Sequence, residues 1–203
     1  MARPSILATY NKSMSDLAII GRYLHKSKSL PPEMYGFVAE VLMLRMFSIL
    51  ENSVREVSIR VACGVPYKNG VVSTPIIKCS SIPDALNRFK SVGRRKPLTN
   101  LNFSNVKHTN DSIKYIINSS EPIRVKLTHY GNEFEQMRIV RNHIAHRNES
   151  TYNHFKSVII NKYGAYLKLK PSVFLTSTKR QPRALIEEYL ITIRVIINDI
   201  TDG

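Results

Sequence analysis

The sequence predicts an all-α fold, a bundle of four or five main helices, and three runs of residues indicate it. Residues 33–62 contain no proline and only one glycine, Gly36, so this stretch favours one long helix. Residues 183–200 place apolar side chains at helical spacing along one stripe. The stripe consists of Leu185, Ile186, Tyr189, Leu190, Ile193, Ile196, Ile197 and Ile200. Residues 132–148 form a third run with an apolar frame at helical spacing.

The first half of the chain adds a helix before the long one. Residues 5–26 predict a helix, and Pro31-Pro32 begins the next element because proline suits the first turn of a helix. We expect the long helix to end at Gly64, since glycine commonly follows a helix end. Between Phe37 and Leu50 the long helix is apolar on nearly every side, which indicates a central helix or one in a subunit interface.

The remaining residues predict shorter elements within one domain that spans residues 1–203, with residues 65–131 as an insertion. The insertion is expected to hold an irregular connection at 65–81, a short helix at 82–91, a basic loop at 93–97, a helix capped by Asn110 or Asp111 that runs through Asn118, and a turn at Glu121-Pro122. Residues 152–163 predict another short helix. Alternation around Pro171 predicts a small β-hairpin within residues 165–177.

The charge balance is strongly basic. The chain carries 30 Lys and Arg against 15 Asp and Glu, a formal net charge of +15. Such an excess predicts a polyanionic partner, with nucleic acid as the leading expectation and an anionic membrane surface second. A basic surface that serves solubility alone is the plain alternative. No apolar run approaches the length of a membrane-spanning helix, so no membrane span is expected, and RNA rather than a membrane is the predicted partner.

Cysteine usage and the N-terminal residues favour a cytoplasmic protein. Cys63 and Cys79 are the only cysteines, and neither lies in a CxxC pattern. We expect both to be reduced and buried, although a disulfide between them stays open. The N-terminal residues lack the continuous apolar core of a signal peptide. Carboxylates and histidines show no metal-ligand spacing, so no metal or other cofactor is expected.

The third apolar run carries the residues that point to a chemistry. Arg141 and Asn142 are adjacent, and His146 follows with four residues between it and Arg141. A guanidinium group presents a fixed fork of donors to phosphate oxygens. An imidazole has an ordinary pKa near neutrality, so it can both take and give a proton. Together the three residues favour phosphodiester chemistry.

Arg141-Asn142-x-x-x-His146 resembles the Arg-(four to six residues)-His motif of HEPN domains, in the form with a polar residue directly after the arginine. The resemblance extends to a late amphipathic helix that follows a long apolar one. HEPN domains are all-helical, and many are metal-independent endoribonucleases of toxin–antitoxin, abortive-infection and other antiviral defence systems. The resemblance therefore implies a homodimer with the active site at its interface and an antitoxin or defence-system partner.

The resemblance and the side-chain chemistry together assign a role to each residue. RNA supplies its own nucleophile, the 2′-hydroxyl group. We expect His146 to withdraw the proton of this hydroxyl or to protonate the leaving 5′-oxygen. Arg141 would stabilise the charge that grows on the phosphorane oxygens, and Asn142 would orient the imidazole or the phosphate. The expected products are a 2′,3′-cyclic phosphate and a 5′-hydroxyl end.

Two other pairs have suitable spacing, Arg138 with His143 and Arg147 with His154. The first pair has an apolar residue directly after its arginine, and the second spans a stretch that reads as a turn, so the motif pair fits better. His143 is then expected to be a solvated or an interface histidine.

The motif pair has one geometric difficulty. Residues five apart on an ideal helix point about 140° away from each other, so Arg141 and His146 do not share a face of a regular helix. A distorted helix, a long reach of the arginine, or two motif helices from two chains would bring such residues together. The last of these agrees with the dimer that the resemblance implies.

Contacts to the RNA backbone are expected from Arg94, Arg95 and Lys96 in the basic loop and from Arg147 beside the motif. For the loop, a merely solvated surface is an equal alternative. The same two interpretations apply to Lys168, Lys170, Lys179, Arg180 and Arg183. Ten tyrosines are present and could stack bases, although burial in the core is the better expectation for Tyr35 and Tyr189.

The alternative to an enzyme is a catalytically inactive HEPN-like module that binds nucleic acid or mediates assembly. Such a module would share the basic surface and the dimer, but it would show no cleavage that depends on His146. A DNA-binding accessory protein is a weaker alternative, because the sequence shows no helix-turn-helix pattern.

Overall fold

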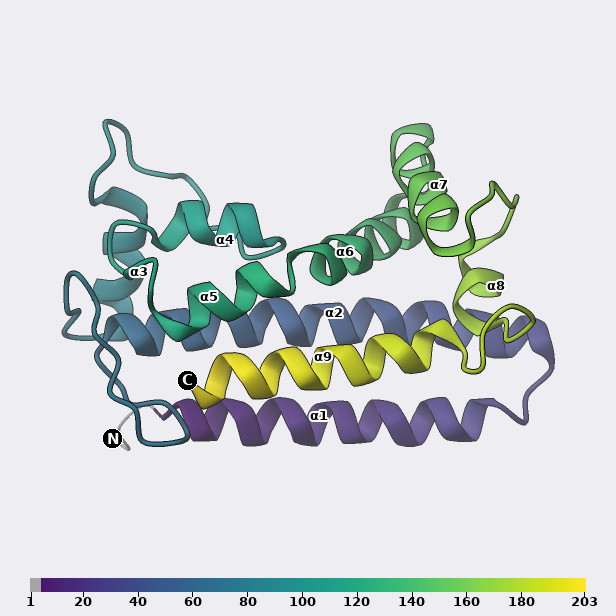
Figure 1. Ribbon diagram of the computed structural model, residues 1–203, viewed down its shortest axis with the longest axis horizontal. Coiled ribbons are helices and arrows are strands. Elements are labelled where there is room, and N and C mark those ends of the chain that lie inside the picture. Colours follow the sequence, from purple (N-terminus) through teal and green to yellow (C-terminus); the bar gives the residue numbers. More distant parts are fainter. Residues whose placement is uncertain (1–4) are drawn as a thin grey trace. The chain divides into compact units, whose positions relative to one another are not determined.

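The computed structural model describes residues 5–203, and these residues form nine α-helices and no β-strand (Figure 1). Of the residues that the structure describes, 67% are helical, which confirms the all-α prediction. The helices are α1 (Ile6–Ser27), α2 (Pro32–Ala62), α3 (Ile82–Ser91), α4 (Val106–Ile113), α5 (Pro122–His129), α6 (Gly131–His146), α7 (Glu149–Tyr163), α8 (Pro171–Thr176) and α9 (Leu185–Asp202). Among them α1, α2, α6, α7 and α9 have fifteen residues or more, in agreement with the four or five main helices expected.

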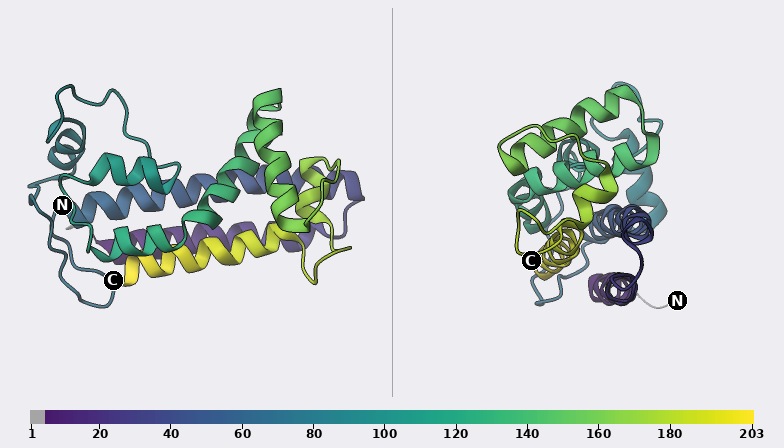
Figure 2. Two further views of the ribbon diagram at one scale, coloured as in Figure 1. Left: turned by 45° about the horizontal axis from the view of Figure 1, so that its top comes forward. Right: turned by 90° about the vertical axis from the view of Figure 1, so that its right-hand side faces the viewer.

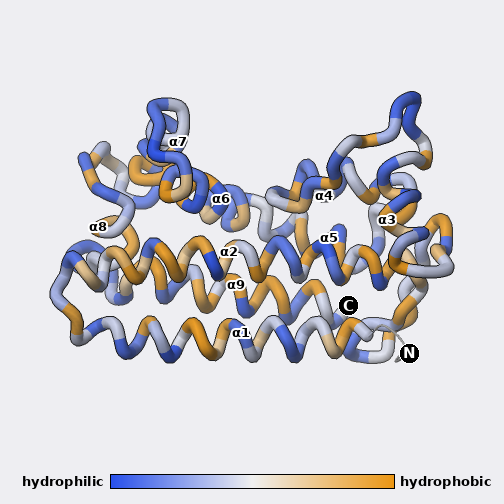
Figure 3. Tube along the Cα trace, turned by 180° about the vertical axis from the view of Figure 1, so that it is seen from behind, coloured by the Kyte–Doolittle hydropathy of each residue, from blue (hydrophilic) through white to orange (hydrophobic). Residues whose placement is uncertain are grey.

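The helices α1, α2, α3 and α9 lie within two residues of their predicted limits. At 31 residues α2 is the longest helix of the described chain, and Gly64, with a φ of 74°, follows its end. Every residue of the stripe predicted for α9 is buried. Figure 3 shows hydrophobic positions recurring along this helix. Periodicity therefore located the longest helices.

The chain folds into two compact units. The first unit holds the residues up to Met14 together with Leu50–Asn132 and Val195–Gly203, and the second holds Ser15–Ile49 and Glu133–Arg194. The predicted insertion belongs entirely to the first unit, to which it contributes α3, α4 and α5. The single domain expected over the whole chain stays a prediction.

In the second unit, aromatic pairs join the helices around the motif. Phe47 of α2 packs edge-on against Phe134 of α6, with 5.5 Å between the ring centroids. Phe155 of α7 packs in the same way against Phe174 of α8, at 5.2 Å. Figures 1 and 2 both show α7 and α8 close to each other after the end of α6. Such edge-to-face contacts fix the position of the rings as well as burying them.

The helix predicted to start at Asn110 or Asp111 is wrong. The structure instead forms α4, and Asn105 caps it by accepting a hydrogen bond of 2.7 Å from the backbone N–H of His108. The Asn110 side chain serves another purpose, because its oxygen accepts a hydrogen bond of 3.0 Å from Nε of Arg124. A partner fourteen residues away in the sequence therefore decides which asparagine acts as the cap.

The turn predicted at Glu121-Pro122 lies slightly earlier in the chain. The N–H of Glu121 donates a hydrogen bond of 3.1 Å to the Asn118 carbonyl oxygen, and Pro122 is already the first residue of α5. The β-hairpin expected within residues 165–177 is wrong: residues 165–170 form no regular element, and Pro171 begins α8. Phe174 and Leu175 are both buried. Neighbouring residues on a strand would point to opposite faces, whereas a short helix can bury both.

A buried carboxylate in the first unit holds an irregular segment in place. Glu121 accepts hydrogen bonds from the Tyr67 hydroxyl at 3.1 Å and from the backbone N–H and hydroxyl of Thr74 at 3.3 and 3.2 Å. The Tyr67 hydroxyl in turn accepts a hydrogen bond from the Ile123 N–H at 3.4 Å. Burial first, and then the Glu121 charge, raises the pKa of Tyr67. Residues 67–74, which form no helix, are thus anchored to the start of α5.

Replacing this carboxylate should weaken the fold measurably. Glu121→Ala leaves the buried Tyr67 hydroxyl and the Thr74 N–H without their acceptor, so we expect a loss of about 1–3 kcal/mol in the free energy of unfolding. Urea denaturation would measure the loss. Glu133→Ala, at an exposed position in the first turn of α6, is the control and should cost about 0.5 kcal/mol. Equal losses in both variants would contradict the anchoring role.

Candidate functional site

The motif lies on α6, and the helix presents its three residues to different degrees. A buried stripe at spacings of three and four residues fixes the orientation of the helix. The stripe consists of Phe134, Met137, Val140 and Ile144. Arg141 and Asn142 flank this stripe and are half-buried, whereas His146, the last residue of the helix, is exposed.

Arg141 is held in place by its neighbour and by the core. Its Nη1 donates a hydrogen bond of 2.9 Å to the side-chain oxygen of Asn142. The guanidinium carbon lies 6.0 Å from the ring centroid of Phe47, a buried residue of α2. A guanidinium group has five N–H donors, and within residues 5–203 only this one is engaged. The predicted phosphate ligand is therefore oriented and still has donors to offer.

Arg141 and Asn142 are brought together, but His146 is not brought to either of them. The side chain of His146 forms no hydrogen bond or ion pair with any other residue between 5 and 203. The helix is regular as far as His146, so the angular separation of about 140° expected for residues five apart is retained. One chain therefore presents the guanidinium and the imidazole in different directions.

The end of α6 is set by the backbone of Arg147. Its φ of 46° makes it the one non-glycine residue between 5 and 203 in the left-handed region. The predicted helix to residue 148 is therefore wrong by two residues. Asn148 instead caps α7 by accepting a hydrogen bond of 2.9 Å from the N–H of Thr151. As a result α7 begins at Glu149, in a stretch that the sequence suggested was a turn.

The side chain of Arg147 forms an ion pair with Glu40 of α2. The carboxylate is buried, with 6% of the residue exposed, while 63% of the arginine side chain is exposed. Removing one partner of such a pair leaves a charge without compensation in a buried place. Arg147 therefore has a structural partner, and its predicted contact with RNA stays a prediction.

His143 is buried, so the expectation of a solvated histidine is wrong. Its ring stacks on Phe155 with 4.9 Å between centroids, and its Nδ1 lies 3.1 Å from the Thr151 hydroxyl. Burial first, and then the charge of Arg147, lowers the pKa of His143. The neutral imidazole is thus favoured, and it ties α6 to the first turn of α7.

A groove of about 760 Å³ lies beside this end of α6, within the second unit. Its lining includes Glu40, His143, Arg147, Lys170 and the exposed ring of Phe37. Neither Arg141 nor His146 lines it. The groove therefore accompanies the motif without containing its two principal residues.

The other Arg–His pairs meet different surroundings. Arg138 is bound to Glu135, to which its Nε donates at 2.8 Å, and this hydrogen bond raises the pKa of the arginine. Its counterpart His143 is buried, as described above. His154 is exposed on α7, but its counterpart Arg147 is paired with Glu40. Arg141 is the arginine of the three that has no acidic partner among the described residues.

The basic loop after α3 divides into one structural arginine and two exposed cations. The guanidinium of Arg94 donates to the backbone oxygens of Phe89, Asp111 and Ser112, the last two at the end of α4. Arg95 and Lys96 are exposed. All three stay predicted RNA contacts. The guanidinium of Arg94 is already engaged by backbone oxygens, whereas the charged groups of Arg95 and Lys96 have no such contacts among the described residues.

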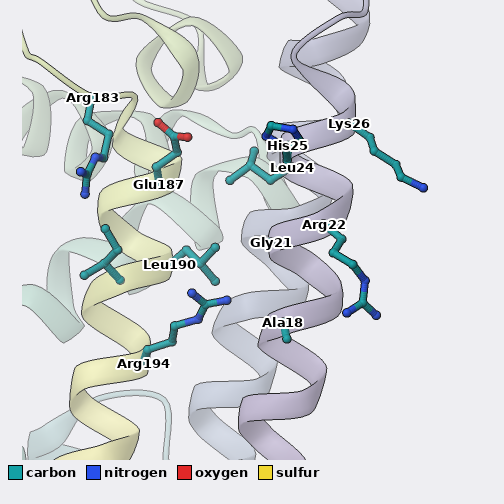
Figure 4. A pocket seen from close by; sticks show the side chains of 11 residues that line it. Ala18, Gly21, Arg22, Leu24, His25, Lys26, Arg183, Glu187, Leu190 and Arg194 are labelled. Atoms are coloured by element: carbon teal, nitrogen blue, oxygen red, sulfur yellow. The ribbon is translucent and has the colours of Figure 1, made fainter.

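A second groove, of about 730 Å³, lies between α1 and α9 in the second unit, and its lining includes several basic side chains. Arg194 reaches from α9 to α1, where it donates a hydrogen bond of 3.2 Å to the Leu17 carbonyl oxygen beside Gly21 (Figure 4). In the same view Arg22 and Lys26 project away from α9, so the cations do not converge on one point. Sequence analysis missed this groove, because no pattern in the sequence relates Gly21 to Arg194.

Comparison with known proteins finds no matching family model, no matching curated protein and no matching solved structure. Among residues 5–203, no group of three or more His, Cys, Asp or Glu side chains is arranged to hold a metal ion. None of the helices in this range combines the length and the apolar character that a membrane span requires. Cys63 and Cys79 are both free thiols.

The environment of His143 predicts a pH dependence of stability. Because its pKa is lowered in the folded chain, the unfolded chain binds a proton there at a higher pH than the folded chain does. The stability contributed by neutral His143 is therefore present above the unfolded value of 6.5 and is lost as the pH falls below it. We expect the wild type to lose more stability between about pH 7.5 and about pH 5.5 than His143→Asn, which keeps a polar atom near Thr151. Urea denaturation at the two pH values would measure this, and equal losses would contradict it.

Proposed function

We propose that this chain is a metal-independent endoribonuclease of the HEPN type, which acts as a homodimer. The observation that carries the proposal is the presentation of Arg141 and His146 by one regular helix, with the guanidinium oriented by Asn142 and the imidazole exposed. The formal net charge of +15 supports a polyanionic substrate. The resemblance to HEPN domains supplies the reaction and its products, a 2′,3′-cyclic phosphate and a 5′-hydroxyl end.

Each residue has a role that its surroundings support. Arg141 would bind the non-bridging oxygens and stabilise the charge that develops on them, because its free N–H donors are held in a fixed direction. The exposed His146 would exchange protons with the 2′-hydroxyl or the leaving 5′-oxygen. Asn142 would act by positioning Arg141, since its side-chain oxygen accepts the hydrogen bond from that guanidinium. The expected contact of Asn142 with the imidazole or the phosphate stays a prediction, since the NH2 group of its side chain is not used in this hydrogen bond.

A second chain would complete the site. Arg141 and His146 point about 140° apart on one helix, so an arginine from one chain and a histidine from its partner are needed on the same phosphate. Most of the apolar stretch between residues 37 and 50 is buried within the chain, but Phe37 and Val41 remain 66% and 40% exposed. Tyr23 and Lys26 of α1 share an apolar groove with these two residues. This surface supports an interface with a second copy.

The separation of the two residues in one chain also favours the second candidate, a catalytically inactive module that binds RNA or mediates assembly. On one regular helix the two residues point about 140° apart, so a single chain does not present the guanidinium and the imidazole side by side to one phosphate. Both candidates predict RNA binding, but only the ribonuclease predicts RNA cleavage. A toxin or antiviral defence role, a cognate antitoxin or defence-system partner and a cytoplasmic location belong to the first proposal through the HEPN resemblance.

RNA cleavage in EDTA by the purified protein tests the enzyme directly. We expect His146→Ala and Arg141→Ala each to lower the cleavage rate by at least about a hundredfold, because each removes a group that acts in the transition state. Arg138→Ala and His154→Ala, which break the other Arg–His pairs, are the matched controls and should stay within about threefold of the wild type. Cleavage by all variants at one rate would rule out the motif.

Mixing the two inactive variants tests the shared site. A heterodimer of Arg141→Ala and His146→Ala keeps one arginine and one histidine on different chains, so the mixture should regain cleavage that neither variant shows alone. No recovery, with subunit exchange verified by size and label, would mean that one chain supplies both residues. Wild-type protein that binds RNA and never cleaves it would support the inactive module instead.

A further inference from the structure

Residues 147–183 concentrate positive charge just beyond the motif. This segment holds one acidic residue, Glu149, against eight basic residues: Arg147, Lys156, Lys162, Lys168, Lys170, Lys179, Arg180 and Arg183. Eight cations and one acid leave +7, close to half of the formal +15 of the chain. Two of these cations, Arg147 and Lys162, are paired with Glu40 and Glu188, and the other six form no ion pair with a described residue, so they are available to attract an anionic partner.

Two tyrosines are interleaved with these cations. The hydroxyl of Tyr152, on α7, is hydrogen-bonded to the hydroxyl of Tyr166, in the segment that follows α7. The ammonium group of Lys156 lies 4.5 Å from the centroid of the Tyr166 ring, and Lys168 follows two residues later at an exposed position. Tyr166 is 44% exposed. We name these four residues the α7 surface.

Anchoring of the segment after α7 explains only part of this arrangement. The hydroxyl–hydroxyl contact would hold Tyr166 to α7, but it does not require an exposed ring. Nor does it require the two lysines, neither of which forms an ion pair with any described residue. Exposed aromatic rings beside unpaired cations are the features that bind the bases and phosphates of single strands.

The α7 surface is connected to the motif by direct contacts. Thr151, directly before Tyr152, approaches Nδ1 of His143 on α6 at 3.1 Å. The ring of Tyr152 lies 5.7 Å from the ring of His143, between centroids. Only Arg147 and Asn148 separate α6 and α7, so a strand bound at the α7 surface would continue toward the end of α6 that carries His146.

We propose that the α7 surface binds single-stranded RNA, with a base stacked on Tyr166 and phosphates bound by Lys156 and Lys168. The inference rests on the proposed function, whose substrate it specifies. Bases in a duplex already stack on one another and cannot lie flat on a side chain, whereas unpaired bases can. The surface therefore selects single strands, loops and ends over paired RNA.

A fluorescent reporter can detect the stacked base without cleavage. The chain contains no tryptophan, so Tyr166→Trp in a His146→Ala background would report from that position alone. We expect a ten-nucleotide single-stranded RNA to quench this fluorescence saturably, and the same sequence as a blunt duplex to leave it unchanged. Leu7→Trp, at an exposed position on α1 away from the grooves described above, is the matched control and should show no quenching. The proposal would be overturned if only the duplex quenched the fluorescence of Tyr166→Trp, or if neither RNA quenched it.

Binding measurements separate stacking from charge. Tyr166→Ala should weaken binding of the single strand by about five- to a hundredfold, while Tyr166→Phe, which keeps the ring, should stay within about twofold. The double variant Lys156→Ala, Lys168→Ala should bind RNA with a weaker dependence on salt concentration. The slope of log binding constant against log salt concentration should fall by about 2, which corresponds to the loss of two phosphate contacts. The control variant Lys12→Ala, Lys107→Ala removes the same charge at exposed positions outside the segment, and it should leave this slope unchanged.

These outcomes remain separable from those of the ribonuclease. If single strands quench the fluorescence of Tyr166→Trp but the wild-type protein never cleaves RNA, the proposed α7 surface is supported and the proposed ribonuclease activity is overturned. Cleavage that depends on His146 but is indifferent to Tyr166→Ala and to the paired lysine substitution would support the enzyme and overturn the α7 surface.

Discussion

The arrangement at the end of α6 depends on a left-handed backbone at Arg147. That conformation costs a residue with a side chain about 1–2 kcal/mol relative to the right-handed one, and glycine would adopt it without strain. Glycine, however, could not neutralise Glu40, which is buried on α2 and bound by the Arg147 guanidinium. The ion pair therefore requires arginine at a position whose backbone favours glycine. The left-handed conformation of Arg147 ends α6 at His146, leaves the imidazole of His146 exposed, and turns the chain toward α7.

The candidate site divides its two tasks between a fixed and an accessible group. Arg141 has its direction set by Asn142 and by the ring of Phe47, so its ordering entropy is already lost before an anion arrives. His146 projects into solvent and carries no partner in residues 5–203. In the proposed reaction a preorganised Arg141 would stabilise charge and an accessible His146 would transfer protons, and different chains or a moving RNA strand would have to bring the two groups together. The structure of one chain thus contains the parts of a site rather than a finished one.

Sequence reasoning located the long helices and placed Arg141 and His146 on one helix, because hydrophobic periodicity is a local signal. It also anticipated the angular separation of Arg141 and His146, which follows from helix geometry alone. It failed where a distant partner decides the outcome. Asn110 looked like a cap but is occupied by Arg124, and the cap is Asn105. His143 looked solvated but is covered by Phe155 of the next helix. Residues 166–176 alternate like a strand, yet Phe174 and Leu175 must be buried side by side, which α8 achieves.

The crowding of like charge in residues 147–183 has a consequence for the protein without its ligand. The eight cations of this segment repel one another. Glu40 and Glu188 neutralise Arg147 and Lys162, and the ions of the surrounding solution screen the cations that have no acidic partner among the described residues. Counterions that screen this repulsion would make the segment more stable, while the same counterions weaken attachment to a polyanion. Stability and binding would then respond to ionic strength in opposite senses. A bound polyanion would take over the role of the displaced ions, so this part of the molecule would be most firmly folded when it is occupied.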